Sequence, residues 1–129
     1  MVGFDVRAIK KGDYNYIIKL NPDIAYLEEE LVGDNKTIVA QLNDDVIGYL
    51  KYYIDGNNRA KIIDLVVDEM YRGLGVGYQL FLELEGRIKN EYVNDILVAG
   101  RNFTKEELNF YNRQGFRYDI NSNLEKRLN

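Results

Sequence analysis

The chain has 129 residues, 46% of them hydrophobic and 29% charged, an ordinary composition for one globular domain. It contains no cysteine, which excludes disulfides, thiolate metal sites and an acyl-cysteine intermediate, and no histidine, the commonest general base and metal ligand. The net charge of −4 argues against broad nucleic-acid binding, and no apolar run approaches the roughly 20 residues needed to cross a bilayer.

Apolar and polar residues alternate over residues 4–9, which predicts a first strand. A short helix is predicted around residues 14–20. It should end before Pro22, because the residue that precedes a proline disfavours helical backbone. Asn21 and Pro22 have the character of an N-cap and a first helical residue, so we predict a second helix that starts there and stops at Gly33.

Three strands are predicted next, at residues 37–43, 46–54 and 60–68. Polar turns at residues 43–45 and 55–58 separate them. Connections this short join antiparallel neighbours, so the three strands are expected to form the centre of a sheet.

Apolar residues then recur at helical spacing from residue 75 to about residue 90, and a short strand is predicted at residues 95–100. A strand, a helix and a strand in succession form a crossover, and a crossover joins parallel strands. The strands at residues 60–68 and 95–100 should therefore be parallel.

A capping box at Thr104 opens a last helix, which Gly115 closes. Closing strands are expected at residues 116–120 and 124–128. The predicted fold is therefore α+β, with one mixed central sheet flanked by helices in a single domain spanning residues 1–129.

The most informative motif is the run from Arg72 to Gly77, which lies between the strand at residues 60–68 and the following helix. Gly73, Gly75 and Gly77 remove side chains where the backbone turns into the helix. The turn can then present peptide N–H groups to an anion at the positive end of the helix dipole, and a diphosphate would suit it. A side chain at Gly75 or Gly77 is expected to block this anion or the close packing of the helix.

Three other interpretations of this glycine run are open. A Rossmann fingerprint needs a glycine where Tyr78 stands, and hairpins precede the run where a βαβ unit should begin. A Walker loop needs a Lys-Ser/Thr pair that the run lacks. A merely tight turn between strand and helix is the third alternative.

A second motif, Phe-Tyr-Asn-Arg-Gln-Gly-Phe, runs from Phe110 to Phe116. Both phenylalanines suit a core, and Gly115 suits a helix C-cap in the left-handed region. Tyr111 taken alone is equally consistent with packing on an amphipathic helix.

Together, in this order, the two motifs resemble those of the GNAT superfamily of acetyl-CoA-dependent N-acetyltransferases. The family pattern Gln/Arg-x-x-Gly-x-Gly/Ala is met by Arg72, Gly75 and Gly77, and the tyrosine and glycine of its Phe/Leu-Tyr-x-x-x-Gly-Phe unit by Tyr111 and Gly115. The resemblance covers most of the chain.

The resemblance implies that the amides of the glycine turn hold the CoA diphosphate. It also implies that the preceding strand pairs with the pantetheine, in a gap where the fourth and fifth strands splay apart. The residues implied for the cofactor are Leu65, Val66, Val67, Arg72, Gly73, Leu74, Gly75, Val76, Gly77 and Thr104, the last where the family often has asparagine. An acidic chain needs local cations for the phosphates, with Arg72 as the first candidate and Arg101, Lys105 and Arg113 as weaker ones.

The resemblance further implies that Tyr111 protonates the departing CoA thiolate. With no histidine to accept the proton of the amine, Asp64, directly or through water, or Glu69 is the expected base. Asp64 interrupts an otherwise apolar strand beside the glycine turn. The family's base position falls on Lys61 or Asp64, depending on a bulge in the strand, and either acid could instead be a solvated charge.

The sequence thus predicts an N-acetyltransferase that passes acetyl from acetyl-CoA directly to a primary amine of a small molecule or peptide. The alternative is a non-catalytic CoA-binding regulatory module with the same fold. We expect a cytoplasmic monomer or homodimer with no metal, no nucleic-acid partner and no membrane partner. The N-terminus has no apolar core of the kind a signal peptide needs.

Overall fold

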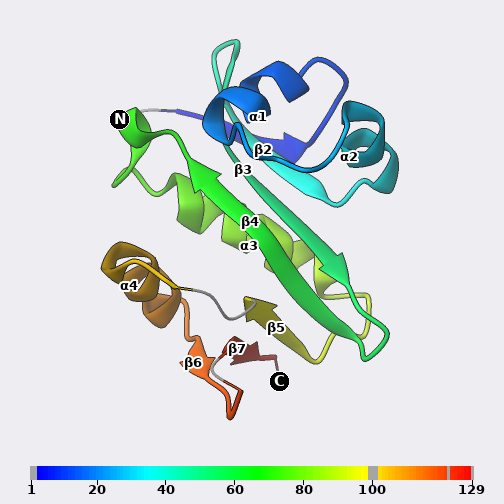
Figure 1. Cartoon of the computed structure of the whole chain (residues 1–129), viewed down its shortest axis with the longest axis vertical. Coiled ribbons are helices and arrows are strands. Elements are labelled where there is room, and N and C mark those ends of the chain that lie inside the picture. The colour runs from blue at the N-terminus through cyan, green and yellow to red at the C-terminus, as the bar shows by residue number, and fades with distance from the viewer. Residues whose placement is uncertain (1–2, 99–101, 122, 129) are drawn as a thin grey trace. The chain divides into compact units, whose positions relative to one another are not determined.

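The computed structural model describes residues 3–98, 102–121 and 123–128 (Figure 1). The chain divides into two compact units, which are described here one by one. The first consists of Met1–Tyr52 and Asp64–Arg87, and the second of Tyr53–Ile63 and Ile88–Asn129.

The described residues form one mixed sheet in the order β1-β2-β3-β4-β5-β7-β6. The strands are β1 (Asp5–Ala8), β2 (Thr37–Leu42), β3 (Asp45–Ile54), β4 (Arg59–Val67), β5 (Asp95–Val98), β6 (Arg117–Tyr118) and β7 (Leu124–Arg127). The helices are α1 (Tyr14–Leu20), α2 (Glu28–Asp34), the 3-10 turn η1 (Glu69–Tyr71), α3 (Val76–Ile88) and α4 (Lys105–Arg113). The pair β4 and β5 is parallel and the other described pairs are antiparallel, which confirms the predicted α+β fold.

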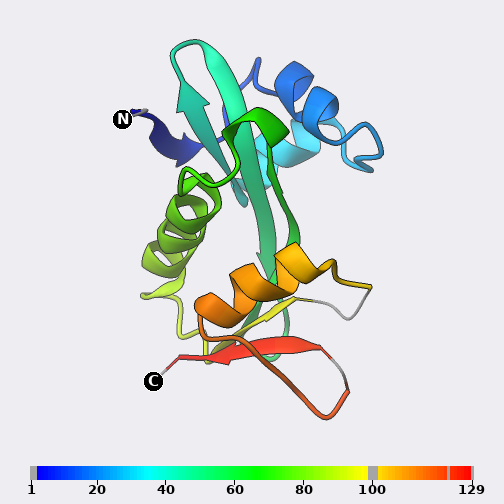
Figure 2. The same ribbon diagram turned by 90° about the vertical axis from the view of Figure 1, so that its left-hand side faces the viewer.

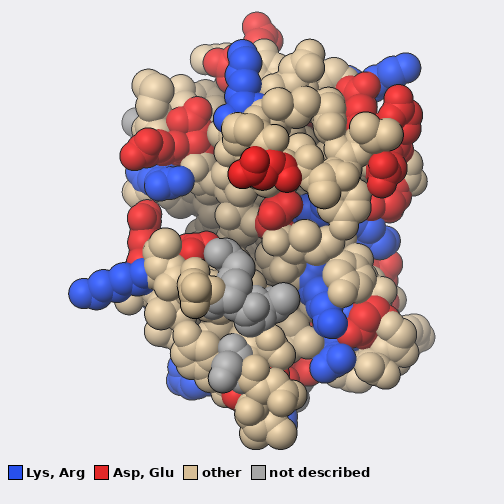
Figure 3. All heavy atoms as spheres, in the orientation of Figure 1, with Lys and Arg blue, Asp and Glu red and all other residues tan. Residues whose placement is uncertain are grey.

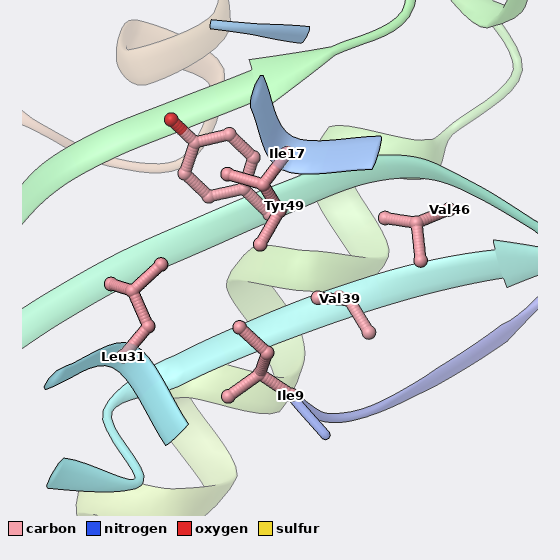
Figure 4. Packing of buried hydrophobic residues seen from close by; sticks show 6 residues of the cluster. All are labelled: Ile9, Ile17, Leu31, Val39, Val46 and Tyr49. Atoms are coloured by element: carbon pink, nitrogen blue, oxygen red, sulfur yellow. The ribbon is translucent and has the colours of Figure 1, made fainter. Parts of the chain in front are cut away.

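In the first unit, α1 and α2 lie on one face of the sheet and α3 lies on the other (Figure 2). A cluster of buried side chains joins α1 and α2 to the sheet, and Tyr49 of β3 is fully buried in it (Figure 4). The other members of this cluster are Ile9, Ile17, Leu31, Val39 and Val46. Because side chains alternate along a strand, Gly48 faces α3 instead. A Cβ atom at Gly48 would lie 3.1 Å from Val66 O and 3.3 Å from Val76 Cγ1, so this glycine lets the N-terminus of α3 pack closely on β3 and β4.

The second helix does not start at Pro22, as the sequence suggests, but at Glu28. Asn21 instead ends α1, where its N–H donates to Ile17 O, and its Nδ2 donates a hydrogen bond to the Tyr49 hydroxyl (2.9 Å). Gly33 lies inside the helix and does not stop it. The stop is Asn35, whose φ of +53° is in the left-handed region that asparagine tolerates.

Acidic side chains gather over α2 on the molecular surface (Figure 3). Three consecutive glutamates, residues 28–30, occupy its first turn, where the helix dipole favours negative charge. They form a charged helix face of an ordinary kind.

In the second unit, β5 pairs with β7, and β7 pairs with β6. The predicted strand at residues 95–100 is confirmed over Asp95–Val98, and Ala99 and Gly100 lie outside the described residues. The predicted capping box is confirmed: Thr104 Oγ1 accepts from the Glu107 N–H (3.1 Å), and Glu107 Oε1 accepts from the Thr104 N–H (2.9 Å).

The C-terminus of α4 is closed by Gly115, as the sequence predicts. Its φ of +95° is in the left-handed region. The N–H groups of Gly115 and Phe116 then donate to the carbonyl oxygens of Asn112 (3.1 Å) and Tyr111 (3.0 Å), which satisfies the last turn of the helix.

Candidate functional site

The turn between β4 and α3 is built from local hydrogen bonds. The Asp68 N–H donates to Ile47 O (2.8 Å), which keeps the end of β4 on β3. The Asp68 carboxylate accepts from the Met70 N–H (2.9 Å) and so starts η1. Gly73 and Gly75 follow with φ values of +80° and +83°, a conformation that glycine adopts without strain.

The turn ends in a set of backbone donors. Within the described residues, the N–H groups of Gly75, Val76 and Gly77 have no acceptor in the chain; the first with one is that of Gln79, which donates to Gly75 O (3.0 Å). The first turn of α3, all of which is described, contains no acidic residue. Free donors and the helix dipole therefore both favour an anion here.

Close packing is not the reason for Gly75. A Cβ atom built at Gly75 meets nothing within 4 Å, so a side chain there would not collide with the helix. The expectation that a side chain at Gly75 would block close packing of the helix is therefore wrong. The positive φ is what requires glycine, because other residues adopt it at a cost of about 1–2 kcal/mol.

Arg72 brings positive charge to the same turn. It is exposed, and its Nε donates to Val67 O (3.3 Å) at the end of β4. This bond holds the guanidinium between the strand and the glycines and leaves its other N–H groups for a ligand. The donor set of this turn, peptide N–H groups and a guanidinium, fits a diphosphate.

The residues that the resemblance assigns to the pantetheine, Leu65, Val66 and Val67, are half-buried at the end of β4. The described pairing of β4 with β5 covers Arg59–Ile62, so these three residues lie beyond that paired stretch. The splaying of the two strands stays a prediction, since residues 99–101, which follow β5, are outside the described part of the chain.

Asp64 belongs to a polar network inside the first unit. The Tyr49 hydroxyl, which accepts from Asn21 Nδ2, donates to the Asp64 carboxylate. Burial of the Tyr49 hydroxyl, with the nearby Asp64 charge, raises the pKa of Tyr49 far above its ordinary value, against the opposing effect of Asn21. Figure 4 shows the Tyr49 hydroxyl turned away from the aliphatic side chains of the cluster and toward β4. Asp64 is therefore a hydrogen-bonded, half-buried acid rather than a freely solvated one.

Glu69, the other candidate base, lies elsewhere. It is exposed on η1 and lines an open groove of about 510 Å³. The groove is bordered by α1, the start of β3, the end of β4 and η1, all in the first unit. The two candidate bases thus occupy different positions, since Asp64 does not line this groove.

Lys61, the third residue considered for the base position, lies in the second unit. Its Nζ is 3.8 Å from Asp55 Oδ2 and 5.9 Å from the centre of the Tyr53 ring. Lys61 is thus engaged by the Asp55 carboxylate and the Tyr53 ring.

Tyr111 belongs to a group of aromatic residues in the second unit, and its side chain is buried, with 3% exposed. Its ring makes edge-to-face contacts with Phe103, Phe110 and Phe116, at centroid distances of 6.1, 5.3 and 5.2 Å. The Tyr111 ring therefore packs in the core, as one of the two interpretations of this residue predicts. The role of its hydroxyl as the acid that protonates the CoA thiolate stays a prediction.

Of the remaining predicted cofactor residues, Thr104 is exposed, and its oxygen accepts the capping bond while its O–H can still donate. Lys105 and Arg113 are exposed at the two ends of α4. Arg101 lies outside the described residues.

The described residues contain no group of three or more carboxylates that could hold a metal ion. None of the described helices is both long and apolar enough to cross a membrane.

A family model decides the relationship: residues 5–116 match the acetyltransferase (GNAT) family. The chain belongs to this GNAT family. The match includes the glycine turn and the Tyr111 motif, so the GNAT chain is an acyltransferase by class. No curated protein sequence matches it.

Solved structures share this GNAT fold at low identity. PaiA N-acetyltransferase from Thermoplasma acidophilum, in complex with coenzyme A, has a TM-score of 0.80 and 17% identity over 98% of this chain and 99% of its own. Ard1 from Thermoplasma volcanium has a TM-score of 0.79 and 20% identity over 99% of both chains. N-acetylglutamate synthase from Neisseria gonorrhoeae, complexed with coenzyme A and N-acetyl-glutamate, has a TM-score of 0.81 and 13% identity over 100% of this chain and 36% of its own.

Sequence reasoning missed two residues that surround the candidate base Asp64. Tyr49 is one of 11 tyrosines and lies in a strand that reads as core, so nothing local distinguishes it. Asn21 precedes Pro22 in a pattern that predicts a helix N-cap, which is a different role from a contact with Tyr49. Only the contact between them, 28 residues apart in the chain, shows the network with Asp64.

Proposed function

We propose that this GNAT protein transfers the acetyl group of acetyl-CoA directly to a primary amine of a small molecule or peptide. The observation that carries the proposal is the glycine turn: three peptide N–H groups without an acceptor among the described residues, beside Arg72, at the start of a 13-residue helix. Coenzyme A in the structure of the similar PaiA supports a CoA ligand. We also propose that residues 1–129 form one such domain.

Acetyl-CoA supplies a thioester carbonyl that an amine can attack, with loss of the CoA thiolate. In the proposed reaction a C–N bond forms, the C–S bond breaks, and two protons move. Tyr111 gives its phenolic proton to the thiolate, which is reasonable because a phenol of pKa about 10 can donate to a thiolate of pKa about 8.5 when both are held out of water. Asp64, directly or through water, or Glu69 takes the proton from the amine.

The glycine turn and β4 position the co-substrate. The N–H groups of Gly75, Val76 and Gly77, with Arg72, would hold the diphosphate, and Leu65–Val67 would pair with the pantetheine. Thr104 can add one O–H donor. A direct transfer also suits a chain that has no cysteine to be acylated.

The second candidate is a non-catalytic CoA-binding module. The observation in its favour is that Asp64 is engaged by the Tyr49 hydroxyl, which leaves Glu69 as the candidate base with no partner among the described residues. Both candidates predict CoA binding, and turnover separates them.

Two measurements test the proposal together. Calorimetry should detect acetyl-CoA binding, and a free-thiol assay with a panel of primary amines should detect CoA release that depends on the amine. Binding without amine-dependent release, over amino acids, amino acid amides, polyamines and short peptides, would support the non-catalytic module. Lack of binding would overturn both candidates.

A further inference from the structure

The floor of the 510 Å³ groove is apolar. It is formed by Leu20 of α1, Val46 and Ile47 of β3, and Val66 of β4. Val46 and Ile47 are buried, and Leu20 and Val66 pack against the core cluster. A molecule in the groove would therefore gain by placing an aliphatic or aromatic group on this floor.

The charges at the rim are mostly negative. Asp45, Asp68 and Glu69 oppose Lys19 and Arg72. Asp45 accepts the Tyr16 O–H, and partial burial together with this carboxylate raises the pKa of Tyr16. Asp68 is used as the cap of η1, whereas the Glu69 carboxylate has no partner among the described residues.

The two cations of the rim are already engaged. Lys19 Nζ lies 5.6 Å from the centre of the Tyr16 ring. Arg72 donates a hydrogen bond to Val67 O beside the glycine turn. In the proposed function it binds the CoA phosphates there. With Arg72 assigned in this way, the rim carries three carboxylates and one ammonium.

The groove also touches the strand proposed to hold the co-substrate. Val66, Val67 and Arg72 line the groove and belong to the predicted cofactor set. A molecule on the apolar floor would therefore lie against the end of β4.

We infer that this groove binds the acceptor of the proposed reaction and selects a primary amine with an apolar group and no carboxylate on the carbon next to nitrogen. The inference rests on the proposed function. The amine binds as its ammonium form, which the rim carboxylates attract, and loses one proton to solvent before it attacks the thioester; an acceptor carboxylate at the same place would be repelled. Amino acid amides, alkylamines and peptide N-termini meet this description, and free amino acids do not.

Leucinamide and leucine are the matched probes, because they share the amine and the side chain and differ only in carrying a neutral amide or a carboxylate beside the amine. Their dissociation constants are measured by chemical-shift titration of the labelled protein, saturated with CoA, at a pH low enough for both amines to be protonated. We expect leucinamide to bind about tenfold more tightly than leucine and to shift the amides of residues that line the groove. Equal affinities, a preference for leucine, or shifts confined to other residues would overturn the inference.

A second acidic residue supplies the control. Asp45→Asn should reduce the preference for leucinamide about threefold, because it removes one rim charge. Glu91→Gln removes the same charge from an exposed residue of the second unit that does not line the groove, and should leave the preference within about twofold of wild type. An equal effect of both variants would show that the general field of the protein, not the groove, makes the distinction.

The same titration without CoA separates this inference from the proposed function. If acetyl-CoA does not bind but leucinamide is still preferred in the groove, the enzymatic proposal fails, and the groove is an amine-binding site that is not an acceptor site. If CoA binds and amines are acetylated without discrimination, the groove assignment fails alone. The thiol assay also compares isoamylamine with a tetrapeptide that begins with leucine. The better acceptor of the two shows whether the protein acetylates free alkylamines or peptide N-termini.

Discussion

Gly75 shows how one backbone angle can control a ligand site. Gly75→Ala places a Cβ atom in open space, so any loss comes from the φ of +83° and not from a clash. We expect CoA affinity to fall about tenfold, because a strain of ~1–2 kcal/mol is relieved by reshaping the turn. Calorimetry of the folded variant measures this.

Gly86→Ala is the matched control for Gly75. Gly86 lies inside α3, and a Cβ there also meets nothing within 4 Å. Alanine should leave CoA affinity unchanged and stabilise the helix by about 0.5–1 kcal/mol. Equal CoA affinity in the two variants would contradict the role assigned to the left-handed conformation.

Tyr111→Phe tests the proposed general acid. The ring and its contacts with three phenylalanines are retained, so fold and CoA affinity should hold. Loss of a general acid typically lowers kcat by about 10²–10⁴, and we expect the lower end because the CoA thiolate leaves reasonably well unaided. A wild-type kcat, at a pH where chemistry limits the rate, would show that Tyr111 serves packing alone.

The Tyr49 hydroxyl offers a test of Asp64 that does not remove the acid itself. A donated hydrogen bond favours the charged carboxylate, so Tyr49→Phe should raise the pKa of Asp64 and move the acidic limb of the pH–rate profile to higher pH. Asp64→Asn should abolish that limb. If Asp64→Asn keeps the full wild-type profile, Asp64 is not the base, and the same experiment on Glu69→Gln becomes decisive.

At the scale of an element, the β6–β7 connection depends on one carboxylate. The N–H groups of Asn123 (2.9 Å) and Asn121 (2.8 Å) donate to Asp119 Oδ1. The bond from Asn123 is the main cause of a lowered pKa for Asp119, and the bond from Asn121 adds to it against partial burial.

The lowered pKa fixes the sign of a pH effect on stability. The stability from ionised Asp119 is present above the unfolded pKa of about 3.9 and is lost as pH falls through the folded pKa. The Tm of wild type should therefore exceed that of Asp119→Asn at neutral pH, and the gap should close in acid. A gap that stays constant with pH would contradict this assignment.

At the scale of the whole molecule, ligand binding should appear as thermal stability. A ligand present at about 100 times its Kd stabilises a protein by ~2.7 kcal/mol, so CoA should raise the Tm by roughly 5–10 °C. Arg72→Ala should reduce this shift and its dependence on salt, because one phosphate contact is lost. Lys89→Ala removes an exposed charge just past α3 and should leave both unchanged; an equal loss in the two variants would mean that net charge alone is responsible.

Features that depend on neighbours along the chain are the ones that the amino-acid pattern predicts. The hairpin turns, the crossover between parallel strands, the Thr104 capping box and the Gly115 stop are all present, because turn and cap chemistry act over a few residues. The glycine run was recognisable for the same reason: its conformational requirement is local.

Where side chains with several possible partners go depends on contacts between distant segments. Asn21 is predicted to cap the second helix, but it ends α1 and its side chain reaches across to Tyr49 of β3, and α2 begins at Glu28. The partner of Asp64 and the charges that face one another across the groove likewise come from separate elements. Such contacts depend on how distant segments pack, and no local pattern encodes that packing.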